Sequence, residues 1–344
     1  MCRARTRHYS RHIYQAALLL ILLGLILPAS GAWAQDQPKG TPENPWVIGM
    51  SQSTRTHPWR AKMDEDIAAA AKENGKFKVI FKDAQDDSLR QRGQVEEFIA
   101  AGVDLIMIMP NEAVPLAKPV AKAYDEGIPV IVLGSRVATP KYTCFICGDN
   151  YKLGEAVGKW AIEKLGGKGK IVELKGLMTS TPGQNRHAGF RNAIKDANFE
   201  IVFEADMKWL GPEARKEMES ALARCPEIDM VYAHNDPAAF GAYVAAKAAG
   251  REKEMLFVGI DSMPEEGVAY VRQGVLDATF EYPNGGKEAI AIAEKILSGE
   301  KVPKDLLLPS RVYTKDNVAQ GGEYIWGDKP IAAEPKPEKE DEQP

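Results

Sequence analysis

Short apolar runs, each ending abruptly in polar residues before a helix-patterned segment, constrain the fold of this chain most strongly. The segment 230–236 (MVYAHND) shows the pattern, and Pro237 can open the helix that follows. The runs 104–109 (DLIMIM) and 128–133 (IPVIVL) are apolar almost throughout. Such continuous runs are typical of strands buried on both faces of a parallel sheet, whose carboxyl ends bind ligands.

The strand and helix patterns alternate in two blocks, near 46–145 and 150–280. Each block has the size of a doubly wound domain, so the sequence predicts an α/β protein with two such parallel-sheet domains. A helix near 285–298 and one extended piece near 305–313 follow both blocks and must pack on them. The polar segment 327–344 has no apolar period and is predicted to be disordered.

The first 34 residues are predicted to be a cleavable signal peptide that directs export of the protein. A basic stretch precedes an apolar core at 16–27, which is short for a membrane span, and Ala32-Trp33-Ala34 fits a small-x-small cleavage pattern. We expect cleavage after Ala34, and an uncleaved anchor is the alternative. The leader carries four Arg and no acid, so the remaining chain has 40 basic and 48 acidic residues. This balance and the lack of a basic stripe argue against nucleic acid as a partner.

Cysteine and histidine usage indicates neither a redox site nor a metal site. Three cysteines follow the leader, and Cys144 and Cys147 lie on a strand-like run, where positions i and i+3 point to opposite faces; the third is Cys225. His57 and His234 have no third His or Cys at ligand spacing. The common nucleophile, phosphate-loop and zinc-protease motifs are missing from the sequence, so we expect no catalysis and no cofactor.

Polar and aromatic side chains that could bind a ligand follow the predicted strands. They are Trp59, Arg60, Asp83, Ser135, Arg136, Arg186, Asn235, Asp261 and Glu281. Carboxylates, amides and guanidinium groups bond hydroxyls directionally, and aromatic rings cover the apolar faces of a sugar ring. Each residue also has a plainer interpretation: Asn235 and Asp261 as helix caps, Asp83 as a loop acid, Arg186 as a solvated charge. For Trp59, the plainer interpretation is a hydrophobic staple of its helix.

The chain resembles the periplasmic sugar-binding proteins of ABC importers, of the ribose and galactose type, over about 46–315. The motifs that carry the resemblance are VIGMSQ (47–52), AAGVDLIMIMP (100–110), GIPVIVL (127–133), YTCFICGDN (142–150), RHAGF (186–190), MVYAHND (230–236), LFVGIDSMPEEG (256–267) and DATFEYP (277–283). Within this family, SQ-x6-WR (51–60) and VYAHND look most like the galactofuranose-binding branch.

The resemblance implies roles for several residues. Trp59 and Arg60 match the pair that stacks on and bonds the sugar, and Arg186 matches an arginine that bonds ring hydroxyls. Asn235 and Asp261 match the amide and carboxylate of the next two strand ends. Three further positions are less direct matches: Glu281, with a one-residue alignment uncertainty; Met207, at a position where the family has an aromatic ring; and Trp209, which could supply that ring instead.

The clearest departure from the family follows the fourth strand. The family commonly has Leu-Asp-Arg there, whereas this chain has Leu133-Gly134-Ser135-Arg136. The loss of a carboxylate indicates a ligand with a different hydroxyl pattern, which leaves a polyol or another non-sugar compound as an alternative.

The resemblance further implies a monomeric, non-catalytic receptor of the type I fold that delivers a monosaccharide to a membrane permease. Its lobes would span 46–147 plus 283–309 and 148–282 plus 310–326, joined by a three-segment hinge. A subunit that presents ligand to a sensor is an alternative. The enzyme alternative is a sugar hydrolase with Asp261 and Glu281 as its acid pair.

Overall fold

The computed structural model describes residues 38–327 and 331–332. The predicted signal peptide and most of the predicted disordered tail therefore lie outside the described residues. The fold given below is that of the unit that begins at Gly40.

The first sheet has the strand order β14-β11-β5-β4-β3-β1-β2. All of its neighbouring strands run parallel except β14, which is antiparallel to β11. The strands are β1 (Trp46–Gln52), β2 (Phe77–Asp83), β3 (Leu105–Met109), β4 (Val130–Leu133), β5 (Cys144–Gly148), β11 (Asp305–Leu308) and β14 (Ile331–Ala332).

The second sheet has the strand order β13-β12-β10-β9-β8-β6-β7, with β12 antiparallel to both of its neighbours and the rest parallel. Its strands are β6 (Lys168–Lys175), β7 (Asn198–Asp206), β8 (Met230–Ala233), β9 (Leu256–Asp261), β10 (Ala278–Glu281), β12 (Ser310–Thr314) and β13 (Glu323–Trp326). The predicted α/β class with two parallel sheets is confirmed.

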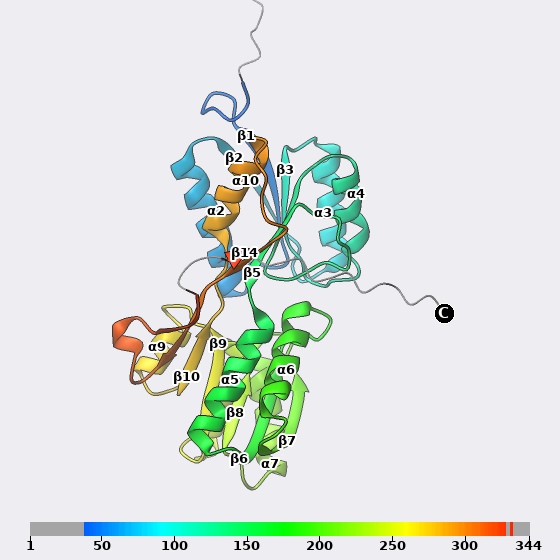
Figure 1. The fold of residues 1–344 in the computed structure, drawn as a ribbon. Helices are drawn as coiled ribbons and strands as arrows, with labels where there is room; N and C mark the ends of the chain where they lie inside the picture. The colour runs from blue at the N-terminus through cyan, green and yellow to red at the C-terminus, as the bar shows by residue number, and fades with distance from the viewer. Residues whose placement is uncertain (1–37, 328–330, 333–344) are drawn as a thin grey trace, which may run out of the picture. The chain divides into compact units, whose positions relative to one another are not determined.

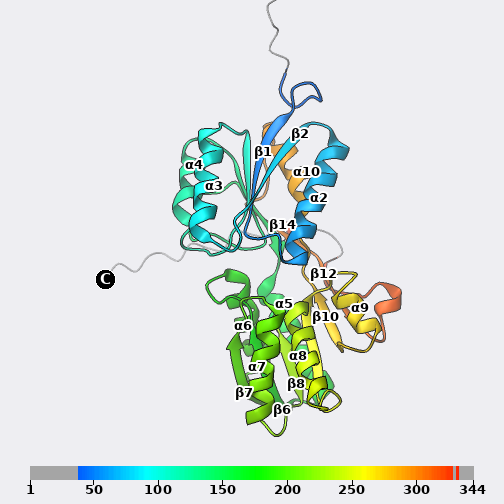
Figure 2. The ribbon, with the colours of Figure 1, turned by 180° about the vertical axis from the view of Figure 1, so that it is seen from behind.

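Helices cover both faces of each sheet (Figure 1). Around the first sheet, α2 packs against α10 and α3 against α4; around the second, α5 packs against α6 and α7 against α8, seen from behind in Figure 2. Their bounds are α2 (Pro58–Asn74), α3 (Ser88–Ala100), α4 (Ala117–Asp125), α5 (Asn150–Leu165), α6 (Thr181–Ile194), α7 (Gly211–Arg224), α8 (Asp236–Ala248), α9 (Gly267–Arg272), α10 (Gly286–Leu297) and the 3-10 turn η1 (Val318–Gln320). We call each sheet with its helices the first and second lobe.

The apolar runs form buried strands, as their composition predicts. All five residues of β3 and all four of β4 and β8 are buried, because helices cover both sides of these central strands. The free cysteines Cys144 and Cys147 are buried in β5, and burial raises the pKa of the Cys144 thiol to about 12.

The segment predicted as one extended piece near 305–313 is two strands in two different sheets. Its first half, β11, pairs with β5, whereas β12 pairs with β10. Pro309 lies between them and has no N–H to continue a ladder, so the chain changes sheets at this residue. Within 327–344, predicted to be disordered, Ile331 pairs with Leu307 and Ala332 with Leu306 as β14.

Two glycines allow α5 and α6 to approach closely. A Cβ atom on Gly154 would lie 2.2 Å from the backbone oxygen of Arg186, and one on Gly189 would lie 2.0 Å from the backbone oxygen of Tyr151. Because Arg186 lies on α6, this close packing fixes where its side chain starts.

We expect Gly154→Ala to lower the free energy of unfolding by about 1–3 kcal/mol, the usual cost of overpacking. Gly93→Ala is the matched control, because Gly93 lies within α3 and a methyl group added there would have no atom within 4 Å. It should raise the free energy of unfolding by up to about 1 kcal/mol through helix propensity. Urea unfolding followed by circular dichroism measures both, and equal effects of the two substitutions would contradict the packing argument.

Candidate ligand-binding site

A small cavity lies where strand ends of the two lobes meet. The lining combines aromatic, cationic, amide, hydroxyl and carboxylate groups: His57, Trp59, Arg60, Met109, Ser135, Ser180, Pro182, Arg186, Trp209, Asn235, Asp261 and Tyr282. Seven of the eleven residues predicted from the sequence are among them.

The start of α2 supplies the first-lobe side of the cavity. Pro58 occupies the first turn of the helix, which points Trp59 and Arg60 toward the strand ends. The Trp59 ring stacks on Tyr282, with ring centroids 4.9 Å apart, and its Nε1 donates to the Tyr282 carbonyl at 2.6 Å. Trp59 is thus fixed as an aromatic wall of the cavity.

The guanidinium of Arg60 is buried yet has no hydrogen-bond acceptor among the described residues. Burial lowers its pKa, and the carboxylates of Asp86 and Asp261 partly offset that effect. A guanidinium carries five N–H donors, and leaving them unpaired in a buried place is costly. Arg60 is therefore the strongest unused donor in the cavity.

Arg186 is buried and held by the protein itself. Its Nε donates to Asn150 Oδ1 at 2.9 Å, and its Nη1 donates to the His234 carbonyl. The guanidinium lies over the Tyr282 ring, 4.5 Å from the centroid, which is a cation–π contact. Arg186 is also among the residues that line the cavity.

Asp261 faces Arg186 from the end of β9, with Nη1 and Oδ1 3.8 Å apart, too far for a hydrogen bond. Its backbone has φ 134° and Ser262 has φ 57°, which is strained for side-chain-bearing residues. Asp236 maintains this turn, because its carboxylate accepts the Ser262 N–H at 2.7 Å and the Thr279 hydroxyl at 2.6 Å. Burial raises the pKa of Asp261 well above its ordinary value and that of Asp236 to about 7.

Asn235 both lines the cavity and caps a helix, the two roles considered for it in the sequence analysis. Its Oδ1 accepts the Ala238 N–H at 3.3 Å and so caps α8, while its Nδ2 donates to the Trp209 carbonyl at 3.0 Å. The same Nδ2 lies 3.0 Å from Nε2 of His57, in the other lobe. Burial, together with Arg60 and Arg186, lowers the pKa of His57 to about 3.

Ser135 lines the cavity next to the lobe boundary, and its hydroxyl lies 3.5 Å from that of Thr181 on α6. Arg136, predicted as a site residue, does not line the cavity. Its guanidinium forms a bidentate pair with Asp305, at 3.0 and 2.9 Å, and lies over the Phe145 ring. A partner 169 residues away thus draws Arg136 away from the cavity.

Three other predicted residues also lie outside the cavity lining. The Asp83 carboxylate accepts the Gln85 N–H at 2.9 Å, as a loop acid does. Met207 is fully buried in the second-lobe core; the next two residues have positive φ, and this turn brings Trp209 to the cavity instead. Glu281 lies beside Arg311 in a neighbouring hollow, and the residue after it, Tyr282, takes the cavity position.

The sequence analysis missed five lining residues: His57, Met109, Ser180, Pro182 and Tyr282. Tyr282 was within the one-residue alignment uncertainty at Glu281. His57 was considered only as a metal ligand, although its place directly before Pro58 and Trp59 was a usable signal. No local pattern pointed to the other three.

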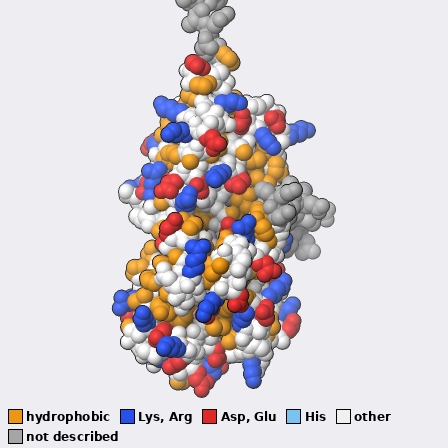
Figure 3. Space-filling model, turned by 90° about the vertical axis from the view of Figure 1, so that its left-hand side faces the viewer, with side chains coloured by type: hydrophobic (Ala, Val, Ile, Leu, Met, Phe, Trp, Pro, Cys, Tyr) orange, Lys and Arg blue, Asp and Glu red, His pale blue; other side chains and the backbone are white. Residues whose placement is uncertain are grey.

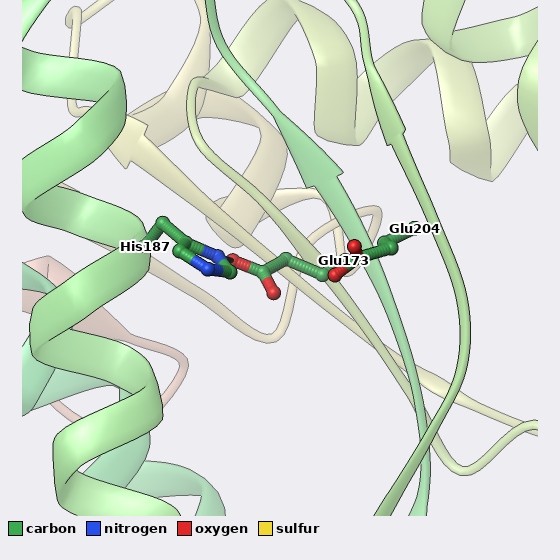
Figure 4. A group of neighbouring side chains, drawn as sticks. All are labelled: Glu173, His187 and Glu204. Atoms are coloured by element: carbon green, nitrogen blue, oxygen red, sulfur yellow. Dashed lines mark hydrogen bonds and ion pairs between the residues drawn. The ribbon is translucent and has the colours of Figure 1, made fainter. Parts of the chain in front are cut away.

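Figure 4 shows a polar cluster in the second lobe, made of Glu173, His187 and Glu204. Ligand atoms of Glu173, His187 and Glu204 lie within 4.8 Å of one another, an arrangement that could hold a metal ion. Arg191 already bridges the carboxylates, with Nε 2.9 Å from Glu173 and Nη2 2.5 Å from Glu204. Glu173 also contacts Nε2 of His234 at 3.2 Å, so the cluster positions the residue whose carbonyl accepts from Arg186.

Figure 3 shows one face of the molecule, on which basic and acidic side chains are intermingled and form no stripe of a single charge. Among the described residues, no helix has the length and apolar character needed to cross a membrane.

Comparison with known proteins gives consistent matches. Residues 48–301 match the family model for the periplasmic binding protein domain. The ribose import binding protein RbsB of Bacillus subtilis (strain 168) is 32% identical over 285 residues, covering 82% of this chain and 92% of that protein. The galactofuranose-binding protein YtfQ of Escherichia coli (strain K12) is 30% identical over 288 residues, covering 80% and 90%.

Among solved structures, the fructose-binding periplasmic domain of a hybrid two-component system superimposes with a TM-score of 0.78 and 42% identity. The match covers 80% of this chain and 93% of that chain. The resemblance inferred from the sequence motifs is confirmed by these matches, as is the type I fold.

We expect Arg186→Lys to lower the free energy of unfolding by about 1.5–3 kcal/mol, because one ammonium group cannot reach both Asn150 and the His234 carbonyl. Arg215→Lys is the control, since Arg215 is exposed and pairs only with Glu219 on its own helix. Its effect should stay within about 0.5 kcal/mol. Chemical unfolding of both variants measures the difference, and a neutral Arg186→Lys would contradict the assigned geometry.

Proposed function

Because this chain belongs to the periplasmic binding protein domain family, we propose that it is a periplasmic receptor that captures a monosaccharide between its lobes. It has no catalytic step in this proposal. A membrane permease of an ABC importer then takes the sugar from it.

The observation that carries the proposal is a pair of buried, opposite charges without hydrogen bonds of their own. Arg60 from the first lobe and Asp261 from the second both line the cavity, and neither side chain has a hydrogen-bond partner among the described residues. A sugar hydroxyl can accept from a guanidinium and donate to a carboxylate at once. Trp59 and Trp209 add aromatic faces for the C–H surfaces of the ring.

Hinge closure is the proposed binding motion. The lobes extend over 46–147 plus 283–309 and 148–282 plus 310–326, joined near 146–150, 280–284 and 308–312. A ligand that contacts both lobes favours the closed arrangement by its differential affinity for that state. The His57–Asn235 and Trp59–Tyr282 contacts are interactions that closure makes or breaks.

The residues also bear on the hydrolase alternative. Glycosidases usually work with two carboxyl groups flanking the bond that breaks. Asp261 is the one carboxylate among the described residues that line the cavity; Glu281 lines the neighbouring hollow, which Asp261 also borders. A single carboxylate in the cavity supports a binding function.

The ligand class we favour is a pentose or hexose, with a furanose form included. The named relatives bind ribose, galactofuranose and fructose, according to their names. Ser135 stands where the family commonly has a carboxylate, so a polyol remains the alternative within the same cavity.

Ligand presentation to a membrane sensor is a second candidate function. The observation that favours it is the 42% identity to a fructose-binding domain that belongs to a hybrid two-component system. In both cases the cavity has the same task and only the docking partner differs.

A melting panel tests the proposal. The chain from Gln35 onward is heated with pentoses, hexoses, furanose-locked sugars and polyols, each in turn. A ligand at 100 times its dissociation constant should add about 2.7 kcal/mol of stability, which raises the melting temperature measurably. No shift with any compound would contradict the receptor function.

Substitutions test the cavity assignment with the sugar that the panel identifies. Trp59→Ala and Asp261→Ala should each weaken binding at least tenfold, about 1.4 kcal/mol, as measured by titration calorimetry. Asp83→Ala is the matched control, because Asp83 ends strand β2 of the first lobe but lies outside the cavity. Equal affinity of all three variants and the wild type would refute the assignment.

A further inference from the structure

We propose that His57 is a latch between the two lobes that works only as a neutral imidazole, so that ligand affinity falls as the medium becomes acidic. The inference rests on the proposed receptor function. It concerns a residue that the sequence analysis did not place among the ligand-binding residues.

The latch is a contact between residues that are 178 positions apart in the chain. His57 immediately precedes α2 in the first lobe, and Asn235 caps α8 in the second lobe. Nε2 of His57 and Nδ2 of Asn235 lie 3.0 Å apart, so the pair joins the lobes across the cavity.

The surroundings of Asn235 fix which atom donates. Its Oδ1 accepts from the Ala238 N–H, and its Nδ2 donates to the Trp209 carbonyl. Reversing the amide would set donor against donor at Ala238 and acceptor against acceptor at Trp209. The amide therefore presents an N–H to His57, and Nε2 of His57 must be an unprotonated acceptor.

Neutral His57 then carries its proton on Nδ1, which is enclosed and has no protein partner among the described residues. This N–H is a free donor at the cavity wall. A protonated His57 would present a second N–H to the amide of Asn235, and the latch would open.

Nearby positive charges also disfavour a protonated His57. Arg60 on α2 and Arg186 on α6 both face His57, so an imidazolium there would be a third positive charge. Burial is the largest factor, and together these effects hold the pKa of His57 at about 3. The Asp261 carboxylate, at the end of β9, also lines the cavity; burial raises its pKa, so its contribution to proton exchange has the opposite sign.

The lowered pKa of His57 determines how ligand affinity changes with pH. In the open receptor we take the ordinary histidine pKa of about 6.5. The closed form has the lower pKa, so closing releases a proton between these two values. The contribution of His57 to affinity is then full above about pH 6.5 and falls up to tenfold per pH unit below it, or about 100-fold by pH 4.5, and Asp261 acts against this fall.

The test is titration calorimetry with the melting-panel sugar at pH 7.5, 6.0 and 4.5, in buffers of different ionisation enthalpy. The buffer series gives the number of protons released on binding. His57→Asn is the main variant, because its amide oxygen can accept from Asn235 without titrating, and His57→Gln is a second one. His187→Asn is the matched control, since it also replaces an imidazole by an amide but at a position on α6 outside the cavity.

The wild type and His187→Asn should lose affinity more steeply between pH 7.5 and 4.5 than the His57 variants, and near pH 5 they should release about one proton more on binding than those variants. His57→Asn and His57→Gln should lose at least tenfold less over the same range, which isolates His57 from Asp261. Equal pH dependence in all four proteins overturns the latch and leaves the receptor function standing. A wild type that binds no compound at pH 7.5 overturns both.

Discussion

The site depends first on the burial of one guanidinium group. Enclosing a charge is costly when hydrogen bonds do not satisfy it, and Arg186 obtains two of them, from Asn150 at the start of α5 and from the His234 carbonyl after β8. The ring of Tyr282 covers its face. Glycines between α5 and α6 allow the backbone of Arg186 to lie where these partners can reach it.

The same contacts connect the cavity to the segments between the lobes. Asn150 Nδ2 donates to the Tyr282 hydroxyl at 3.1 Å, and that hydroxyl donates to the Gly134 carbonyl in the first lobe. A rotation of one lobe therefore changes the surroundings of Arg186 directly. Because Asn150 and Tyr282 lie in or beside segments that join the sheets, binding and lobe movement involve the same residues.

Local sequence patterns predicted the fold and most of the cavity because both follow from short-range periodicity. Apolar runs identified the buried strands, and the polar residues after them identified the strand ends. The predictions failed at residues whose position depends on a partner far away in the sequence or on the backbone conformation of single residues. Arg136 is held by Asp305, which no local pattern indicates, and a turn at positive φ exchanges Met207 for Trp209. Alternation along β10 exchanges Glu281 for Tyr282.

The two cavity arginines differ in their hydrogen bonds, and this difference explains why closure should require a ligand. The protein gives the Arg186 guanidinium two hydrogen bonds, whereas it encloses the side chains of Arg60 and Asp261 without a hydrogen bond to any described residue. Closing over these two groups costs about 1–3 kcal/mol for each, and more because they are charged. A ligand whose hydroxyls bond both groups removes a cost of about 2–6 kcal/mol. The upper part of this range suffices to move a two-state equilibrium from about 1:99 to 99:1, which requires about 5.5 kcal/mol.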